Sequence, residues 1–420
     1  MDKAIQKTWA EKVILNVNRA LPKGNIEFKD WQRYERLLAS GLACEKSISD
    51  FSIANEEAGI LLARLAYYLK NAKADYQQAE ALYLKGLAID EIILSKGHPE
   101  IAKGLNNLAV LYKTQGKYEE AEKLQLRSLA IWESTLGENH PDVAGSLHNL
   151  AEIYRSQGKH AEIEPLYQRC LVINEKVLGN NHPDVASSLN NLAVLYRTQG
   201  KYEKAEPLYR RSLAILEKSL GQNHPDVARC LNNLAGLCVD QCKYAEAESI
   251  YQRSLAILDS ALGKNHPDVA NSLNSFAKLY AAEGKYAQAE SMYQQSIKVW
   301  TSSLGVNHPF VASGLNNLAS LYEAQGKHLD AESLYRKSLT IRETALGEEH
   351  PLVAASLNNL AQLYKTQEKY VEAEPLYQRC LMILEKALGA DHPTTRQGLL
   401  NYEHFLAIKS ELVHFSQSDR

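Results

Sequence analysis

The chain has 420 residues, with 47 Lys and Arg against 50 Asp and Glu and a formal net charge of −3. This balance excludes the basic composition typical of proteins that bind nucleic acid or an anionic membrane, and no run of 18 apolar residues predicts a transmembrane helix. The six cysteines are too few for a disulfide framework, and the charged N-terminus lacks the apolar core of a signal peptide. We therefore expect a cytoplasmic protein.

Residues 1–54 lack the pattern of the rest of the chain, but two stretches within them have helical spacing. These are TWAEKVILNVNRALP and DWQRYERLLASGLACEKSI. Trp9 and Trp31 are expected to anchor the two helices as large apolar side chains. We expect the segment to form a helical cap or linker.

A His-Pro pair then recurs every 42 residues. The histidines are His98, His140, His182, His224, His266, His308, His350 and His392. A fixed period of this length indicates a repeat array, in which each unit packs on its neighbours. We divide the chain into a degenerate unit at 55–97, seven full units at 98–391, a capping helix at 392–412 and a tail at 413–420.

The sequence of one unit predicts two helices. Pro183 suits the first turn of a helix, and His182 would then be the N-cap. The negative charge of Asp184 would interact favourably with the positive end of the helix dipole. Gly200 ends this helix and Gly221 ends the second. The array is therefore expected to be all-α, made of antiparallel helix pairs.

The pattern LNNLAxLYxxQGKYxxAExLYxxSLxI resembles the tetratricopeptide repeat, in the 42-residue form of the kinesin light chain type. The resemblance implies a right-handed superhelical solenoid. It also implies that the first helices of the units line a concave groove that binds a peptide.

Histidines and cysteines are the candidates for a metal site. Equivalent helices of adjacent units pack roughly 8–10 Å apart, which is too far for their histidines to share a zinc ion with bonds of ~2 Å. Cys238 and Cys242 lie four residues apart, which leaves a metal or redox pair open, but they replace the Tyr and the turn Gly of the repeat. We expect no cofactor, and no set of residues stands out from the repeats as a catalytic group.

Asparagines recur in the middle of the first helix, where their side chains compete for backbone hydrogen bonds. They are Asn106 and Asn107, Asn149, Asn190 and Asn191, Asn232 and Asn233, Asn274, Asn316 and Asn317, and Asn358 and Asn359. One interpretation is a ladder of bonds between neighbouring units. The other follows from the resemblance: the asparagines, the first of each pair above all, hold the backbone of a bound peptide.

The resemblance also places variable residues on the groove. The cations among them are Lys103, Lys113, Arg155, Arg197, Arg229 and Lys278, and Glu152 and Asp240 are acidic exceptions. A basic N-terminal half of the groove predicts an acidic peptide ligand, and removal of Arg155 and Arg197 together should weaken its binding. The alternative is an ordinary solvated charged face.

Residues 1–54 also resemble the linker before the repeats in bacterial NB-ARC-like signal-transduction ATPases. This resemblance implies a sensor or adaptor that works with an ATPase module, although the chain has no Walker motif. A different class of function is a structural scaffold, in which similar repeats stack end to end into a homo-oligomer.

Overall fold

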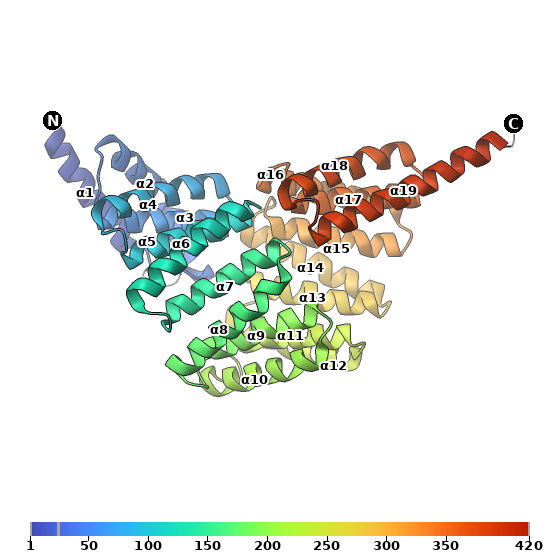
Figure 1. Ribbon diagram of the computed structural model, residues 1–420, viewed down its shortest axis with the longest axis horizontal. Helices are drawn as coiled ribbons and strands as arrows, with labels where there is room; N and C mark the ends of the chain where they lie inside the picture. Colours follow the sequence, from blue (N-terminus) through green and yellow to red (C-terminus); the bar gives the residue numbers. More distant parts are fainter. Residues whose placement is uncertain (1, 23–25, 419–420) are drawn as a thin grey trace. The chain divides into compact units, whose positions relative to one another are not determined.

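The computed structural model describes residues 2–22 and 26–418, and the side chains as far as Glu411. Over these residues the chain is helical with no strand (Figure 1), so the predicted all-α solenoid of paired helices is confirmed. It comprises two compact units: residues 1–156 with 160–179 form unit 1, and residues 157–159 with 180–420 form unit 2.

Unit 1 begins with two helices that precede the pairs. They are α1 (Lys3–Ala20) and, after a short 3₁₀ turn (Phe28–Asp30), α2 (Trp31–Asp50). The pairs are α3 (Glu56–Tyr68) with α4 (Tyr76–Ile93), α5 (Pro99–Thr114) with α6 (Tyr118–Leu136), and α7 (Pro141–Ser156) with α8 (His160–Leu178). A π-helical turn, η2 (Leu69–Lys73), extends α3.

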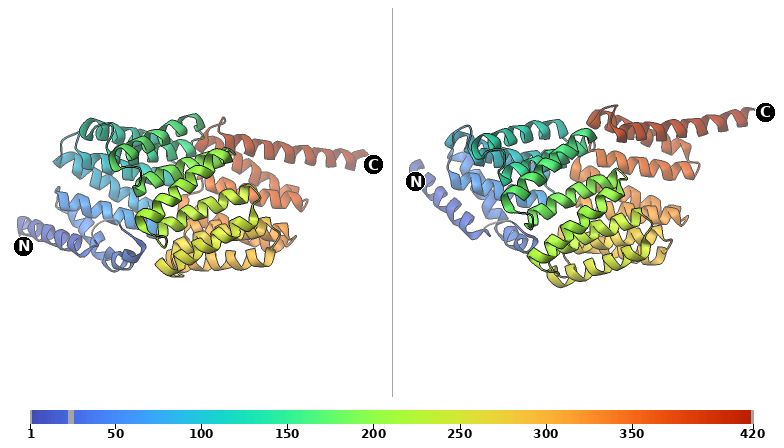
Figure 2. Two further views of the ribbon diagram at one scale, coloured as in Figure 1. Left: turned by 90° about the horizontal axis from the view of Figure 1, so that it is seen from below. Right: turned by 60° about the horizontal axis from the view of Figure 1, so that its bottom comes forward.

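Unit 2 contains five pairs and a final helix. The pairs are α9 (Pro183–Thr198) with α10 (Tyr202–Leu220), α11 (Pro225–Asp240) with α12 (Tyr244–Leu262), α13 (Pro267–Ala282) with α14 (Tyr286–Leu304), α15 (Pro309–Ala324) with α16 (His328–Leu346), and α17 (Pro351–Thr366) with α18 (Tyr370–Leu388). The last helix, α19 (Pro393–Ser418), continues past residue 412, where the capping helix was expected to end. Of the expected tail, residues 419–420 and the side chains from 412 onward lie outside the description. Figure 2 shows the two helices of each pair side by side.

The histidines are helix caps, as predicted. In all eight His-Pro pairs the His Nδ1 accepts a hydrogen bond of 3.0–3.2 Å from the backbone N–H two residues later. This bond satisfies one of the free donors at the helix N-terminus. Within the described part of the chain, no group of three His, Cys, Asp or Glu residues could hold a metal ion.

The QGKY segment is the turn between the helices, and its Lys also joins neighbouring repeats. Tyr280 donates to Glu248 of the preceding repeat at 2.9 Å, and Lys285 Nζ lies 3.7 Å from the same side chain. The Lys285 ammonium also lies 5.3 Å from the centre of the Tyr280 ring. Similar contacts recur in the next two repeats, so this pattern holds these pairs of unit 2 against one another.

The turn needs a residue with positive φ, which glycine usually provides. Gly200 has φ 71°, whereas Cys242 and Glu368 occupy the same turn in their repeats at 59° and 60°. A side chain in this left-handed conformation costs roughly 1–2 kcal/mol.

We therefore expect Cys242→Gly to raise the free energy of unfolding. The gain should be about 0.5–1 kcal/mol, because glycine also makes the unfolded chain more flexible. Cys242→Ala removes the thiol but keeps the strained conformation, so it should not stabilise the protein. Denaturant unfolding of both variants checks this, and equal stabilisation by Ala would contradict it.

Trp9 does not anchor α1, contrary to the prediction. Its side chain is 59% exposed, while Ile14, Val17 and Asn18 are the buried residues of the helix. Asn18 donates to Glu57 at 2.6 Å, so the packed face of α1 is the one turned to α3. Trp31 is half-buried and its ring contacts Phe28 at 5.0 Å between centroids.

Candidate functional site

The asparagines of the first helices form ladders between neighbouring repeats. In each rung the Nδ2 of the second Asn donates to the Oδ1 of the first Asn in the preceding repeat, at 2.8–3.0 Å. The rungs join Asn149 to Asn106, Asn233 to Asn190, Asn317 to Asn274, Asn359 to Asn316, and Asn401 to Asn358. Each bond uses one of the two polar groups of each amide.

The ladder is interrupted where Ser275 replaces the second Asn. There the hydroxyl of Ser272 donates to the Oδ1 of Asn232 at 3.0 Å instead. Asn107 and Asn191, like the asparagines of the rungs, are half-buried on their helices. Asn401 was missed, although it stands at the same place after His392 as the other second asparagines do in their units.

Three cations occupy the C-terminal turns of successive first helices in unit 1. They are Lys70 in η2, Lys113 in α5 and Arg155 in α7, and we call them the cationic strip. Lys113 Nζ lies 3.7 Å from Glu152 Oε2, and Arg155 Nη2 lies 2.5 Å from the same oxygen. A single carboxylate therefore faces two of the three cations.

Electrostatics around the strip favour an added negative charge. Burial lowers the pKa of Lys70 to about 8, and the charge of Lys113 lowers it as well. Burial also lowers the pKa of Lys113, and Arg155 adds to that effect. In both groups burial is the first cause, and a neighbouring positive charge is a further one, while Glu152 acts in the opposite direction on Lys113. Lys70 was missed because the degenerate repeat lacks the asparagine pair by which the other positions were aligned.

Glu152 is the carboxylate within this site. Its Oε1 accepts a hydrogen bond of 2.6 Å from the hydroxyl of Tyr167, and its side chain is 17% exposed. Burial acts to raise the pKa of this carboxyl, but Arg155, Tyr167 and Lys113 together hold the pKa below its usual value. Glu152 is therefore ionised at neutral pH and partly neutralises the strip.

In unit 2, Arg197 is held by its own acidic partner. Its Nε lies 2.6 Å from Asp240 Oδ2 and its Nη2 lies 3.4 Å from Oδ1. A Cβ added to Gly236 would lie 2.5 Å from Arg197 Nη1, so this glycine makes room for the guanidinium. Burial acts to lower the pKa of Arg197, but the bond to Asp240 keeps the pKa above its usual value.

Of the other predicted cations, Lys103 and Arg229 are exposed. Lys103 Nζ lies 3.4 Å from Glu100, and Arg229 contacts Asp226 and Asp268. Lys278 has a lowered pKa, caused first by burial of its amino group and then by Arg197. Arg155 and Arg197, which were expected to act together, belong to unit 1 and unit 2 respectively.

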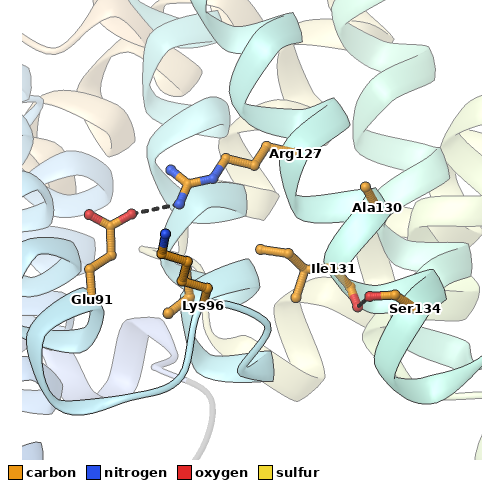
Figure 3. A pocket seen from close by; sticks show the side chains of 7 residues that line it. Glu91, Lys96, Arg127, Ala130, Ile131 and Ser134 are labelled. Atoms are coloured by element: carbon orange, nitrogen blue, oxygen red, sulfur yellow. Dashed lines mark hydrogen bonds and ion pairs between the residues drawn. The ribbon is translucent and has the colours of Figure 1, made fainter.

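A cavity of 670 Å³ lies near α4 and α6 in unit 1 and contains none of the predicted site residues. Figure 3 shows Arg127 bonded to Glu91, at 2.7 Å, with Lys96 beside this pair. Because the guanidinium of Arg127 is already paired with Glu91, this cavity differs from the cationic strip.

Comparisons with known proteins agree with this geometry. The family model described as tetratricopeptide repeat matches eight overlapping segments, 56–134, 100–171, 142–218, 199–260, 226–302, 268–344, 310–386 and 352–402. No curated protein matches the chain. Within the described residues, no helix is long and apolar enough to cross a membrane.

Several solved structures are similar. A putative kinesin light chain from Podosopora anserina, with nearly identical TPR-like repeats, is 28% identical over 49% of this chain and 97% of its own, with a TM-score of 0.40. BtubC (BKLC) from P. vanneervenii is 24% identical over 56% of this chain and 91% of its own, with a TM-score of 0.43. A Rap protein complexed with competence and sporulation factor is 16% identical over 92% of this chain and 98% of its own, with a TM-score of 0.56, and shares the fold.

Proposed function

Because the chain belongs to the tetratricopeptide repeat family, we propose that it is a non-catalytic protein that binds a peptide segment of a partner. The observation that carries the proposal is the cationic strip, where Lys113 and Arg155 share the single carboxylate of Glu152 and Lys70 adds a third cation, whose pKa is lowered by burial and by the charge of Lys113. An acidic segment would supply the missing negative charge through charge-assisted hydrogen bonds.

The asparagines would hold the backbone of the same segment. The ladder bonds fix the orientation of each amide, as in the rung from Asn149 to Asn106. A side chain that is already oriented loses little entropy when it binds, which favours affinity. The remaining amide groups match the alternating donors and acceptors of an extended peptide.

The signalling role rests on residues 1–54. These would link the array to an ATPase module, as their resemblance to NB-ARC-like linkers implies. Asn18 bonds to Glu57 and Arg64, so the end of α1 is attached to the first pair and movement of one would reach the other. The low cysteine content favours the cytoplasm as the place of action.

Self-association is a second candidate. On α1 the side chains of Ile5, Trp9 and Val13 recur every four residues and are 49%, 59% and 49% exposed. On α19, Leu399 and Leu400 are 40% and 57% exposed. Apolar strips of this kind often mark surfaces that bind other proteins.

We expect the double change Lys113→Ala and Arg155→Ala to weaken binding of a fluorescein-labelled, glutamate-rich decapeptide by roughly tenfold or more. Each charge-assisted hydrogen bond contributes about 1.5–3 kcal/mol, and the loss should shrink in high salt. Fluorescence anisotropy with the full chain measures the dissociation constant.

A matched control removes two exposed lysines from second helices of the same unit, Lys123→Ala and Lys176→Ala. Equal weakening by both double variants would show only a general effect of charge and contradict the site. Absence of peptide binding, together with association of the protein that rises with its concentration, would favour the self-association candidate.

A further inference from the structure

Two adjacent repeats of unit 2 depart from the array at the same place. The third residue of each 42-residue repeat, counted from its His, is acidic in the first five repeats: Glu100, Asp142, Asp184, Asp226 and Asp268. In the next two units it is Phe310 and Leu352, which are 44% and 43% exposed. Val306 is 60% exposed and precedes His308, and we call these three exposed apolar residues at the starts of adjacent first helices the apolar patch.

At the apolar patch, α15 and α17 lack the acidic residue that the other repeats have in the first turn of this helix. An acidic residue in the first turn stabilises a helix by roughly 0.3–1 kcal/mol. Phe310 lies against the buried Trp300, with 5.9 Å between the ring centres. The side of Phe310 away from Trp300 remains exposed to solvent.

A buried guanidinium lies beside Leu352. Arg342 in α16 is 6% exposed, and its Nη1 donates to the carbonyl oxygen of Leu352 at 3.0 Å and to Ser356 Oγ at 2.8 Å. Among the described residues, no carboxylate pairs with Arg342: burial alone lowers its pKa, to about 10, and its Nε is buried with no hydrogen-bond partner. The array places Leu or Trp at this position in five other units: Trp132, Leu216, Leu258, Trp300 and Leu384.

These two departures are complementary. At position 352, where an acid would have lain next to Arg342, the chain has an apolar side chain. At position 342, where five other repeats have Leu or Trp, it has a cation. Arg342 uses Nη1 within the protein, while Nε and Nη2 make the edge of the guanidinium that binds a carboxylate with two parallel hydrogen bonds. That edge has no partner in this unit.

We propose that the apolar patch and Arg342 form a second binding site, which takes a protein segment bearing a carboxylate next to an apolar side chain. The apolar side chain of the ligand packs against Phe310, Leu352 and Val306. Its carboxylate meets Nη2 of Arg342 first, because Nε is shielded from solvent. The site is separate from the cationic strip, so it stands whether or not the strip binds an acidic peptide.

N-acetyl-L-phenylalanine is a minimal probe, and N-acetyl-L-phenylalaninamide is its uncharged counterpart. Titration of the full chain, followed by ligand-observed NMR, gives the two dissociation constants. We expect the carboxylate to bind at least about fivefold more tightly than the amide, because a charge-assisted hydrogen bond is roughly twice as strong as a neutral one.

Two variants introduce residues that other repeats have at the same position. Leu352→Asp supplies an internal carboxylate for Arg342, and Arg342→Leu removes the cation. Each should reduce binding of the carboxylate to the level of the amide. Leu329→Asp is the control, because it makes the same change at an exposed residue in the first turn of α16.

The proposal fails if the carboxylate and the amide bind equally well, or if neither binds at millimolar concentration. It also fails if Leu352→Asp and Arg342→Leu bind the carboxylate as well as the unchanged protein does, or if Leu329→Asp weakens binding as much as they do. Circular dichroism confirms that each variant is folded before the titration.

Discussion

Replacement of Glu152 with Gln should lower stability and, at the same time, tighten binding of an acidic peptide. Glu152 lies 3.7 Å from Lys113 and 2.5 Å from Arg155, and it accepts the hydroxyl of Tyr167. Breaking a buried ion pair costs about 3–5 kcal/mol, and partial exposure of Glu152 lowers this to about 2 kcal/mol. The released cations should bind the decapeptide roughly tenfold more tightly, which corresponds to about 1.4 kcal/mol.

The pH dependence of stability gives a second readout. Because the folded-state pKa of Glu152 lies below its usual value, its contribution is present at neutral pH and is lost as the pH falls through that pKa. The unchanged protein and Glu152→Gln should therefore converge in stability at acidic pH. Thermal unfolding across pH and peptide anisotropy measure the two effects.

Glu120→Gln is the control for this experiment. Glu120 is exposed on the second helix α6 of the same unit, so its replacement changes net charge equally without touching the strip. If Glu120→Gln tightens peptide binding as much as Glu152→Gln, net charge alone explains the result and the assignment of Glu152 is wrong.

Gly236→Val should displace Arg197 from Asp240 and destabilise unit 2. The added Cβ would lie 2.5–2.9 Å from three guanidinium atoms, while Val110 and Val194 occupy the same repeat position elsewhere. Overpacking of this kind costs about 1–3 kcal/mol. The loss should be seen as a lower midpoint of denaturant unfolding.

A double-mutant cycle identifies the cause. In an Arg197→Ala background the clash is absent, so Gly236→Val should cost little, and the two changes should be strongly non-additive. Gly145→Val is the matched control, because nothing lies within 4 Å of a Cβ added to this helical glycine. Additive losses would show that Arg197 is not what Gly236 accommodates.

Local features of the fold could be predicted from the sequence because their partners are close along the chain. A His cap bonds to a backbone group two residues away, as His182 does with Asp184, and a turn glycine such as Gly200 acts through its own φ angle. Because the repeat period is fixed, the prediction made for one repeat then applied to all the others. Trp9 was placed wrongly because helical spacing does not tell which apolar face of α1 meets a neighbour.

The candidate site could be predicted only in part. The asparagines and most of the cations were identified, but their partners were not, because each ladder bond joins residues 43 positions apart. Lys70 belongs to the degenerate repeat and was missed, and the sharing of Glu152 by Lys113 and Arg155 requires coordinates.

By itself, the sequence determined the all-α repeat array, its period, its caps and its turns, since these depend on backbone hydrogen bonds and dihedral angles within one unit. Only the tertiary structure decided which charges are neutralised. Arg197 is paired with Asp240, Lys70 has no acidic partner among the described residues, and Arg342 is buried without one. Electrostatic energy depends on distance and burial, and both are set by packing between repeats.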